Sequence, residues 1–247
     1  MGALEGRKVL VIGGSGGMGL AIAEAAVDAG ASVAIAARGA ERLAEAARNL
    51  EERGGREVVR SALQIEDRKA LRDLFGRFGP FDHMALPGST VPPVNYQELD
   101  EAVARASFGS KFWGPFWAVF DARDHMRRGG SIVLFSGVAS QRPVPGYVVG
   151  ACINGALEAA TRSLALELGP SGLRINTISP GFIMTPLFEA LHDPEDIAER
   201  LADAERRLPV GRVGTPAEAA DVALLFMTNG FVTGQILTLD GGLLATY

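Results

Sequence analysis

The chain has 247 residues, 47% of them hydrophobic, and a formal net charge of −5. It is long enough to bury a substantial core, and its scattered Lys and Arg argue against a nucleic-acid partner, which requires a dense basic surface. Cys152 is the single cysteine, so a disulfide framework and a thiolate metal cluster are excluded, and its apolar neighbours predict a buried structural thiol.

Apolar runs alternate with helical patterns along the whole chain. The runs lack polar alternation, which is typical of strands buried on both faces. Predicted strands cover residues 9–12, 32–37, 58–63, 83–86, 131–135, 174–178 and 235–239. Predicted helices cover residues 20–29, 40–53, 67–78, 99–127, 155–168 and 216–227, the last with Thr215 as its cap. This alternation predicts an α/β fold, a doubly wound parallel sheet of Rossmann type, in one domain spanning residues 1–247.

A glycine-rich segment joins the first predicted strand to the first predicted helix. Glycines allow a sharp turn and close approach of the backbone to phosphates, whose charge is met by free N–H groups at the helix N-terminus. The segment therefore predicts a site for a dinucleotide pyrophosphate. Its expected contributors are Gly13, Ser15, Gly16, Gly17, Met18 and Gly19.

The end of the second predicted strand indicates which nucleotide is bound. A chain that uses NAD commonly carries an acidic residue about 20 residues beyond the glycine loop. Here Ala37 is followed by Arg38, whose guanidinium can pair with a 2′-phosphate. NADP (NADPH) is therefore the expected cofactor. The alternative is that Arg38 is a solvated loop residue before the next helix.

Several ordered motifs resemble the short-chain dehydrogenase/reductase superfamily. They are the spacing Gly13-x-x-x-Gly17-x-Gly19, the segments FDHM at 81–84 and GSIV at 130–133, RINTISPGFIMTP at 174–186 and GQILTLDGG at 234–242. The resemblance extends nearly end to end and implies a doubly wound domain that forms homodimers or homotetramers. It also implies cofactor contacts at further residues, with Gln64 and Ile65 near the adenine and Pro180, Gly181, Ile183 and Thr185 beside the nicotinamide.

The active-site positions depart from that family's pattern. The family uses Ser, Tyr and Lys, the last two spaced Y-x-x-x-K, together with an Asn from the helix after the fourth strand. Alignment on residues 156–158 puts Gly150 at the Tyr position and Asn154 at the Lys position. The Ser position holds Gly137 and the Asn position holds Lys111.

Four residues are candidates for the missing chemistry. Lys111 and Asn154 look like an exchange of the family's Asn and Lys, so an ammonium and an amide could still face the nicotinamide ribose, with burial lowering the pKa of the ammonium. Tyr147 lies near the start of the helix that would carry the tyrosine, and Ser136 adjoins the lost serine. Beyond these four, Ser140 is a further candidate. The alternative is that Lys111 extends to the surface and that Asn154 and the hydroxyls are structural.

The expected function is NADP(H)-dependent hydride transfer to or from a small, apolar carbonyl, enone or imine. Residues 187–208 match the family's substrate lid and carry apolar side chains compatible with such a substrate. The alternative is a non-redox nucleotide-binding protein, such as a cyclase, an isomerase or a regulatory binder. The dispersed histidines predict no metal site, and the absence of a membrane-length apolar run or signal-peptide pattern predicts a cytoplasmic protein without a membrane partner.

Overall fold

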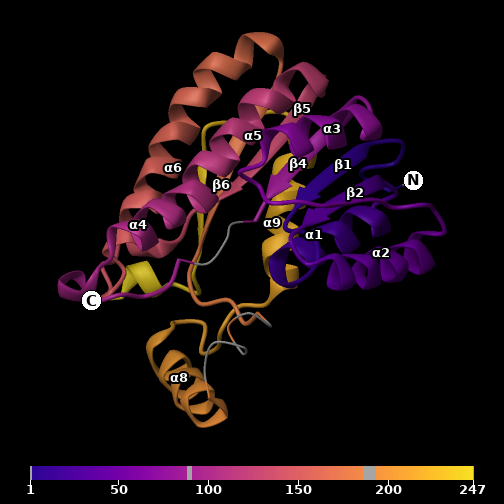
Figure 1. Ribbon diagram of the computed structural model, residues 1–247. Coiled ribbons are helices and arrows are strands. Elements are labelled where there is room, and N and C mark those ends of the chain that lie inside the picture. Colours follow the sequence, from indigo (N-terminus) through magenta and orange to yellow (C-terminus); the bar gives the residue numbers. More distant parts are fainter. Residues whose placement is uncertain (1, 88–90, 186–187, 189–192, 247) are drawn as a thin grey trace.

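The computed structural model describes residues 2–87, 91–185, 188 and 193–246. Within these residues seven parallel strands form one sheet in the order β3-β2-β1-β4-β5-β6-β7 (Figure 1). The strands are β1 (Lys8–Ile12), β2 (Ser32–Ala37), β3 (Val59–Ala62), β4 (Phe81–Leu86), β5 (Met126–Phe135), β6 (Arg174–Pro180) and β7 (Ile236–Leu239). The predicted Rossmann-type sheet is confirmed.

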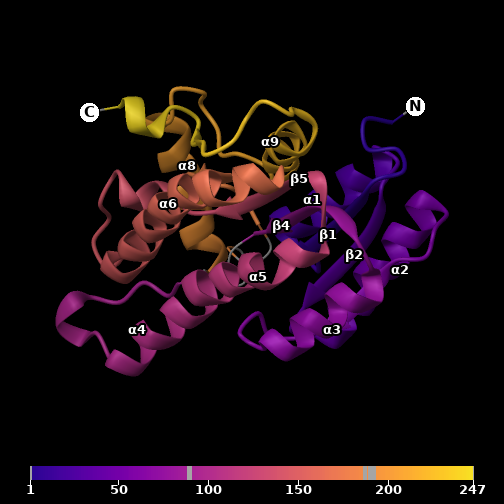
Figure 2. The ribbon, with the colours of Figure 1, turned by 90° about the horizontal axis from the view of Figure 1, so that it is seen from above.

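Helices follow the strands and cover both faces of the sheet. They are α1 (Gly17–Asp28), α2 (Ala40–Gly54), α3 (Arg68–Phe78), α4 (Glu101–Phe108), α5 (Gly114–Ala122), α6 (Val148–Leu168), α8 (Pro194–Arg207) and α9 (Pro216–Thr228). In Figure 2, α5 and α9 lie on opposite sides of the strands. The helix α8 stands apart from both layers in Figure 1, and most of its side chains are exposed.

Two apolar clusters form the core, one on each face. Side chains of α1, α2 and α9 meet one face through residues such as Ile22, Leu43 and Phe226. Side chains of α3, α5 and α6 meet the other through residues such as Phe75 and Leu157. Because β1 and β4 are buried on both faces, alternate residues of one strand enter different clusters, which explains their unbroken apolar sequence.

The predicted helix over residues 99–127 is wrong as a single element. The structure has α4, then a π-helical turn η2 (Gly109–Trp113), then α5, and β5 already begins at Met126. The helix predicted over residues 155–168 instead begins seven residues earlier, as α6 (Val148–Leu168). Cys152, predicted to be buried, is exposed on α6. None of the described helices is both long and apolar enough to cross a membrane.

The sheet has its topological switch between β1 and β4. From β1 the chain builds outward through β2 and β3, whereas β4 to β7 extend from the other side of β1. In such sheets ligands bind beyond the carboxyl ends of the strands at this switch point. The segments that follow β1, β4, β5 and β6 therefore define the candidate site.

Candidate cofactor and active site

The glycine segment turns the chain tightly from β1 into α1. The amide groups of Gly13 and Gly14 donate to the carbonyl oxygen of Ala36 in β2 at 2.7 and 3.2 Å. Gly19 packs against the turn so closely that an added Cβ would lie 2.1 Å from the carbonyl oxygen of Gly13. A side chain at Gly19 would therefore open the turn.

The start of α1 presents its N–H groups without a side-chain cap. Gly16 is the N-cap residue, and the first turn contains no acidic side chain. The opposite wall is near, since a Cβ built on Gly17 would lie 3.5 Å from the Cβ of Thr185. Ser15 and Met18 are partly buried in the same turn. A bare helix N-terminus facing a narrow, glycine-lined space fits a pyrophosphate in charge and in shape.

Arg38 follows β2, at the same edge of the sheet. Its side chain is exposed and makes no hydrogen bond or ion pair with any described residue. The next helix, α2, also begins without a side-chain cap, at Gly39, and a Cβ built there would lie 3.7 Å from Nε of Arg42. Arg38 precedes this helix N-terminus and Arg42 lies in its first turn, in the segment where a 2′-phosphate is expected. Arg42, in the first turn of α2, was missed by the sequence argument.

The residues predicted near the adenine follow β3. Gln64 is exposed, whereas Ile65 is partly buried and packs against the start of α5, since a Cβ on Gly114 would lie 2.6 Å from Cγ2 of Ile65. The roles expected for Gln64 and Ile65 near the adenine stay predictions.

The segment after β6 forms the other wall of the site. Gly181 donates from its N–H to the carbonyl oxygen of Leu239 at 2.9 Å, which continues the pairing of β6 with β7 beyond Pro180. Ile183 then pairs with Gly214 in an isolated parallel bridge. Backbone pairing therefore fixes residues 180–184 before the chain reaches Thr185.

Asn154 lies on the buried face of α6 and points to the end of β5. Its Nδ2 donates to the carbonyl oxygen of Gly137 at 3.1 Å. Its Oδ1 is buried and has no hydrogen-bond partner among the described residues. Because a buried amide oxygen without a partner is costly, this atom is an acceptor available to a ligand hydroxyl.

Ser136 and Ser140 are both engaged with Glu158. Their hydroxyls donate to Oε1 of this carboxylate at 2.9 and 2.8 Å, and Ser140 also donates to the carbonyl oxygen of Gly137 at 3.1 Å. Glu158 lies one turn beyond Asn154 on α6 and is buried. The sequence argument missed Glu158, although its spacing of four residues from Asn154 places both on one helix face.

The ring of Tyr147 lies close to Gly150, the residue at the expected tyrosine position. It is the N-cap residue of α6, and a Cβ built on Gly150 would lie 3.4 Å from Cδ1 of its ring. The same Cβ would lie 3.8 Å from Val91, in the segment that follows β4. The ring of Tyr147 therefore fills the position above Gly150.

Lys111 sits within the π-helical turn η2, which contacts α6. Its side chain is partly buried, and burial lowers the pKa of its ammonium to about 8. No described residue forms a hydrogen bond or ion pair with it. A π-helical turn inserts an extra residue into a helix, so it changes where this side chain points relative to a regular helix.

Comparison with known proteins fixes the family. A family model described as enoyl-(acyl carrier protein) reductase matches residues 13–244. The short-chain dehydrogenase/reductase ATR9 of Stachybotrys chlorohalonatus is 32% identical over 98% of this chain and 98% of its own length. The chain belongs to the short-chain dehydrogenase/reductase family and is an oxidoreductase of that type.

Solved structures agree with this assignment. The reductase/Diels-Alderase MalC of Malbranchea aurantiaca superposes with a TM-score of 0.90 at 26% identity, over 98% of each chain. A small-chain dehydrogenase in complex with NADPH superposes with a TM-score of 0.82 at 30% identity, over 97% of this chain and 99% of that one.

Proposed function

We propose that the protein is an NADP(H)-dependent oxidoreductase that transfers hydride to or from a small, apolar carbonyl, enone or imine. The observation that carries the cofactor choice is the unpaired guanidinium of Arg38, with Arg42 close by and no carboxylate at the end of β2. A phosphate there would receive charge-assisted hydrogen bonds that a ribose hydroxyl cannot match. The relative solved with NADPH supports the same choice.

A bound nicotinamide would supply the hydride, so this chain would have to orient the ribose and handle the proton. Oδ1 of Asn154 would accept from a ribose hydroxyl, a role that an ammonium cannot play because it has no acceptor. The ammonium of Lys111, with its pKa near 8, donates the proton, and the Tyr147 hydroxyl is the second candidate. Loss of a general acid typically costs about 10²–10⁴-fold in rate, so enones and iminium-like substrates that need little acid help suit this site.

The proposed substrate class rests on aromatic side chains in the segment that follows β6. Phe182 and Phe188 stack edge to face with ring centroids 4.7 Å apart. The greater part of the predicted lid is helix α8, and residues 187 and 189–192 lie outside the described part of the chain. An aromatic pair beside the proposed nicotinamide wall favours an apolar substrate.

Nucleotide titration tests the cofactor choice. We expect NADPH to bind more tightly than NADH, and Arg38→Ala to weaken NADPH binding about tenfold, as expected for a lost charge-assisted pair, while leaving NADH binding unchanged. Arg48→Ala, which removes another exposed arginine from α2, is the matched control. Equal affinity of the wild type for both nucleotides would contradict the NADP assignment.

Absorbance at the nicotinamide band tests the redox chemistry. Purified protein is mixed with NADPH and a panel of ketones, enones and imines, and turnover is expected to fall strongly in Lys111→Ala. Nucleotide binding without turnover of any substrate, unchanged by Lys111→Ala, would exclude hydride transfer to these classes.

The second candidate is a protein that binds the nucleotide and performs no net redox step. Gly137 and Gly150 offer no hydroxyl at the positions where the family's pattern is expected to have Ser and Tyr, which favours this second candidate. The similarity to MalC, which is described as a reductase/Diels-Alderase, supports this second candidate. Recovery of unchanged NADPH alongside an isomerised or cyclised product would establish it.

We also propose one domain over residues 1–247 and a homodimer or homotetramer. Aromatic side chains of η2 and α5 support self-association, because Trp113 and Phe120 are 47% and 45% exposed. Sedimentation of the purified protein tests this, and a monomer at micromolar concentration would contradict it. The cytoplasmic location stays a prediction from the sequence.

A further inference from the structure

We propose that Arg212 and Glu218 are positioning residues that hold the nicotinamide wall in place through the backbone of Gly214. The inference rests on the proposed NADP(H) function, because it assigns the wall at Ile183 to the cofactor. The pair lies outside the residues that the sequence motifs and the proposed chemistry assign to the site.

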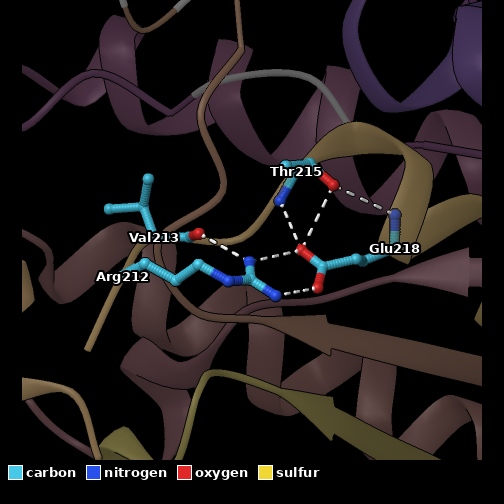
Figure 3. A network of polar contacts seen from close by, with 4 residues as sticks. All are labelled: Arg212, Val213, Thr215 and Glu218. Carbon is cyan, nitrogen blue, oxygen red and sulfur yellow. Dashed lines mark hydrogen bonds and ion pairs between the residues drawn. The ribbon is translucent and has the colours of Figure 1, made fainter. Parts of the chain in front are cut away.

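The two side chains form a closed polar network in the loop before α9 (Figure 3). The guanidinium of Arg212 donates to both carboxylate oxygens of Glu218, at 2.6 and 3.0 Å, and to the carbonyl oxygen of Val213 at 3.1 Å. The N–H and hydroxyl of Thr215 donate to the same carboxylate at 2.8 and 3.2 Å, and the N–H of Glu218 returns a bond to the Thr215 hydroxyl. We call this set of four residues the Arg212 clip.

The Arg212 clip fixes both sides of Gly214. Val213 and Thr215 are held by hydrogen bonds on either side of it, so its two backbone groups have a defined direction. The N–H of Gly214 donates to the carbonyl oxygen of Phe182, and its own carbonyl accepts from the N–H of Met184, both at 2.9 Å. A Cβ on Gly214 would lie 2.4 Å from Cδ1 of Ile183, so the isoleucine packs directly on this backbone.

The clip is attached to the buried helix α9. Glu218 stands in the first turn of α9, whose Ala219, Ala220 and Ala223 are buried in the cluster that also holds α1. The glycine turn lies at the start of α1. The pyrophosphate end and the nicotinamide wall of the site are thus connected through α1, α9, the clip and Gly214.

The charges in the clip persist under assay conditions. The guanidinium of Arg212 and the N–H of Thr215 lower the pKa of Glu218 to about 2, so the carboxylate is ionised at any ordinary pH. Since the side chains of Arg212 and Glu218 are 57% and 35% exposed, solvent screens the pair and a moderate effect is expected.

Hydrogen exchange and nucleotide binding together test the proposal. In Glu218→Gln, without nucleotide, we expect faster amide exchange at residues 182–185 and 213–215, with exchange in β1 and α1 unchanged. The dissociation constant of NADPH should rise about fivefold, while kcat stays within about twofold, because the clip touches neither substrate nor cofactor. Arg212→Lys, which keeps the charge and loses the two-pronged geometry, should give an intermediate effect.

The control is Arg53→Gln in the last turn of α2. It removes an arginine that pairs with Asp28 at 2.6 Å on the exposed surface and leaves the clip intact. Unchanged exchange at residues 182–185 in both Glu218→Gln and Arg212→Lys, or unchanged NADPH affinity in both, would overturn the proposal. A wild-type protein that fails to bind NADPH would overturn the proposed function, whereas the exchange experiment on the nucleotide-free protein still decides whether the clip holds the wall.

Discussion

At the scale of single residues, Gly137 and Asn154 are packed tightly against each other. A Cβ on Gly137 would lie 2.9 Å from Nδ2 of Asn154, closer than real Cβ atoms approach. The amide also donates to the Gly137 carbonyl at 3.1 Å. With Asn154 seated in this way, a serine at residue 137 does not fit without displacing the amide, so the residue types at positions 137 and 154 depend on each other.

This coupling gives a stability prediction. Gly137→Ala should lower the free energy of unfolding by about 1–2 kcal/mol, because the new methyl group overlaps the Asn154 amide. Urea unfolding measures this change. Gly155→Ala, on the helix that carries Asn154, is the control, since a Cβ there meets no neighbour. In an Asn154→Ala background the cost of Gly137→Ala should disappear, and equal costs in both backgrounds would show that the two residues are independent.

Lys111 gives a pH prediction. Burial lowers the pKa of its ammonium to about 8. The protonated form, which can donate a proton, is therefore fully populated well below this pH and is lost above it. For reduction of a ketone, kcat/KM should therefore fall about tenfold per pH unit in the alkaline range. Lys111→Met should remove this limb and leave a low, flat profile. A wild-type alkaline limb that persists in Lys111→Met would assign it to another group, Tyr147 first.

At the scale of elements, Arg174 fastens the end of α9 to the sheet. From the first residue of β6, its buried guanidinium donates to the carbonyl oxygens of Phe226, Met227 and Val232 at 2.6, 3.0 and 3.1 Å. The last carbonyls of a helix have no partner within the helix, and a cation there also interacts favourably with the negative end of the helix dipole.

Removing this anchor should be costly. Arg174→Met leaves three carbonyl groups without their donor, and we expect a loss of about 2–4 kcal/mol in the free energy of unfolding by urea. Arg128→Met provides the comparison, because that arginine is exposed and makes one long bond of 3.4 Å to the Pro170 carbonyl. Equal small losses in both variants would mean that water replaces the guanidinium at the end of α9.

The sequence predicted elements well wherever one local signal decided them. The Thr215 cap and the alternation of apolar runs located α9 and the strands, because capping and burial are local properties. The break at Gly109–Trp113 was missed, since a π-helical turn has no distinctive residue pattern. The early start of α6 was missed because Gly150 and the apolar residues before it read as a loop. The contact of Asn154 with Gly137, and the engagement of both serines by Glu158, depend on packing between elements that spacing cannot supply.

At the scale of the whole molecule, the proposed binding site and a row of buried polar residues lie towards opposite ends of the strands. The glycine turn and the proposed nicotinamide wall lie beyond the carboxyl ends of the strands. Nearer the other ends, His83, Ser131 and Arg174 are register neighbours on β4, β5 and β6 and share the face covered by α9. Nδ1 of His83 and Oγ of Ser131 are buried without a partner among the described residues. This row contributes nothing to the site, but it makes the fold sensitive to protonation.

His83 should therefore dominate the mildly acidic stability of the protein. Burial, aided by the charges of Arg174 and Arg7 and opposed by Asp82, lowers the pKa of the imidazole from 6.5 to about 4. The unfolded chain takes up the proton at a higher pH than the folded one, so the stabilisation is complete above 6.5 and is lost as the pH falls toward 4. The loss over this window is on the order of 3 kcal/mol. The loss that comes from carboxylates with lowered pKa values, such as Asp82 and Glu218, begins where their unfolded forms take up protons, near the ordinary values of 3.8 and 4.5, and continues below them. It therefore enters only at the acidic end of this window.

Urea unfolding in steps from neutral pH to about 4 should show a steep decline in the wild type and a shallow one in His83→Asn, whatever the absolute stability of the variant. His125→Asn, which changes a partly buried histidine in the turn just before β5, provides the comparison with a histidine outside the buried row. If His83→Asn declined as steeply as the wild type, protonation of this row would not be what weakens the sheet in mild acid.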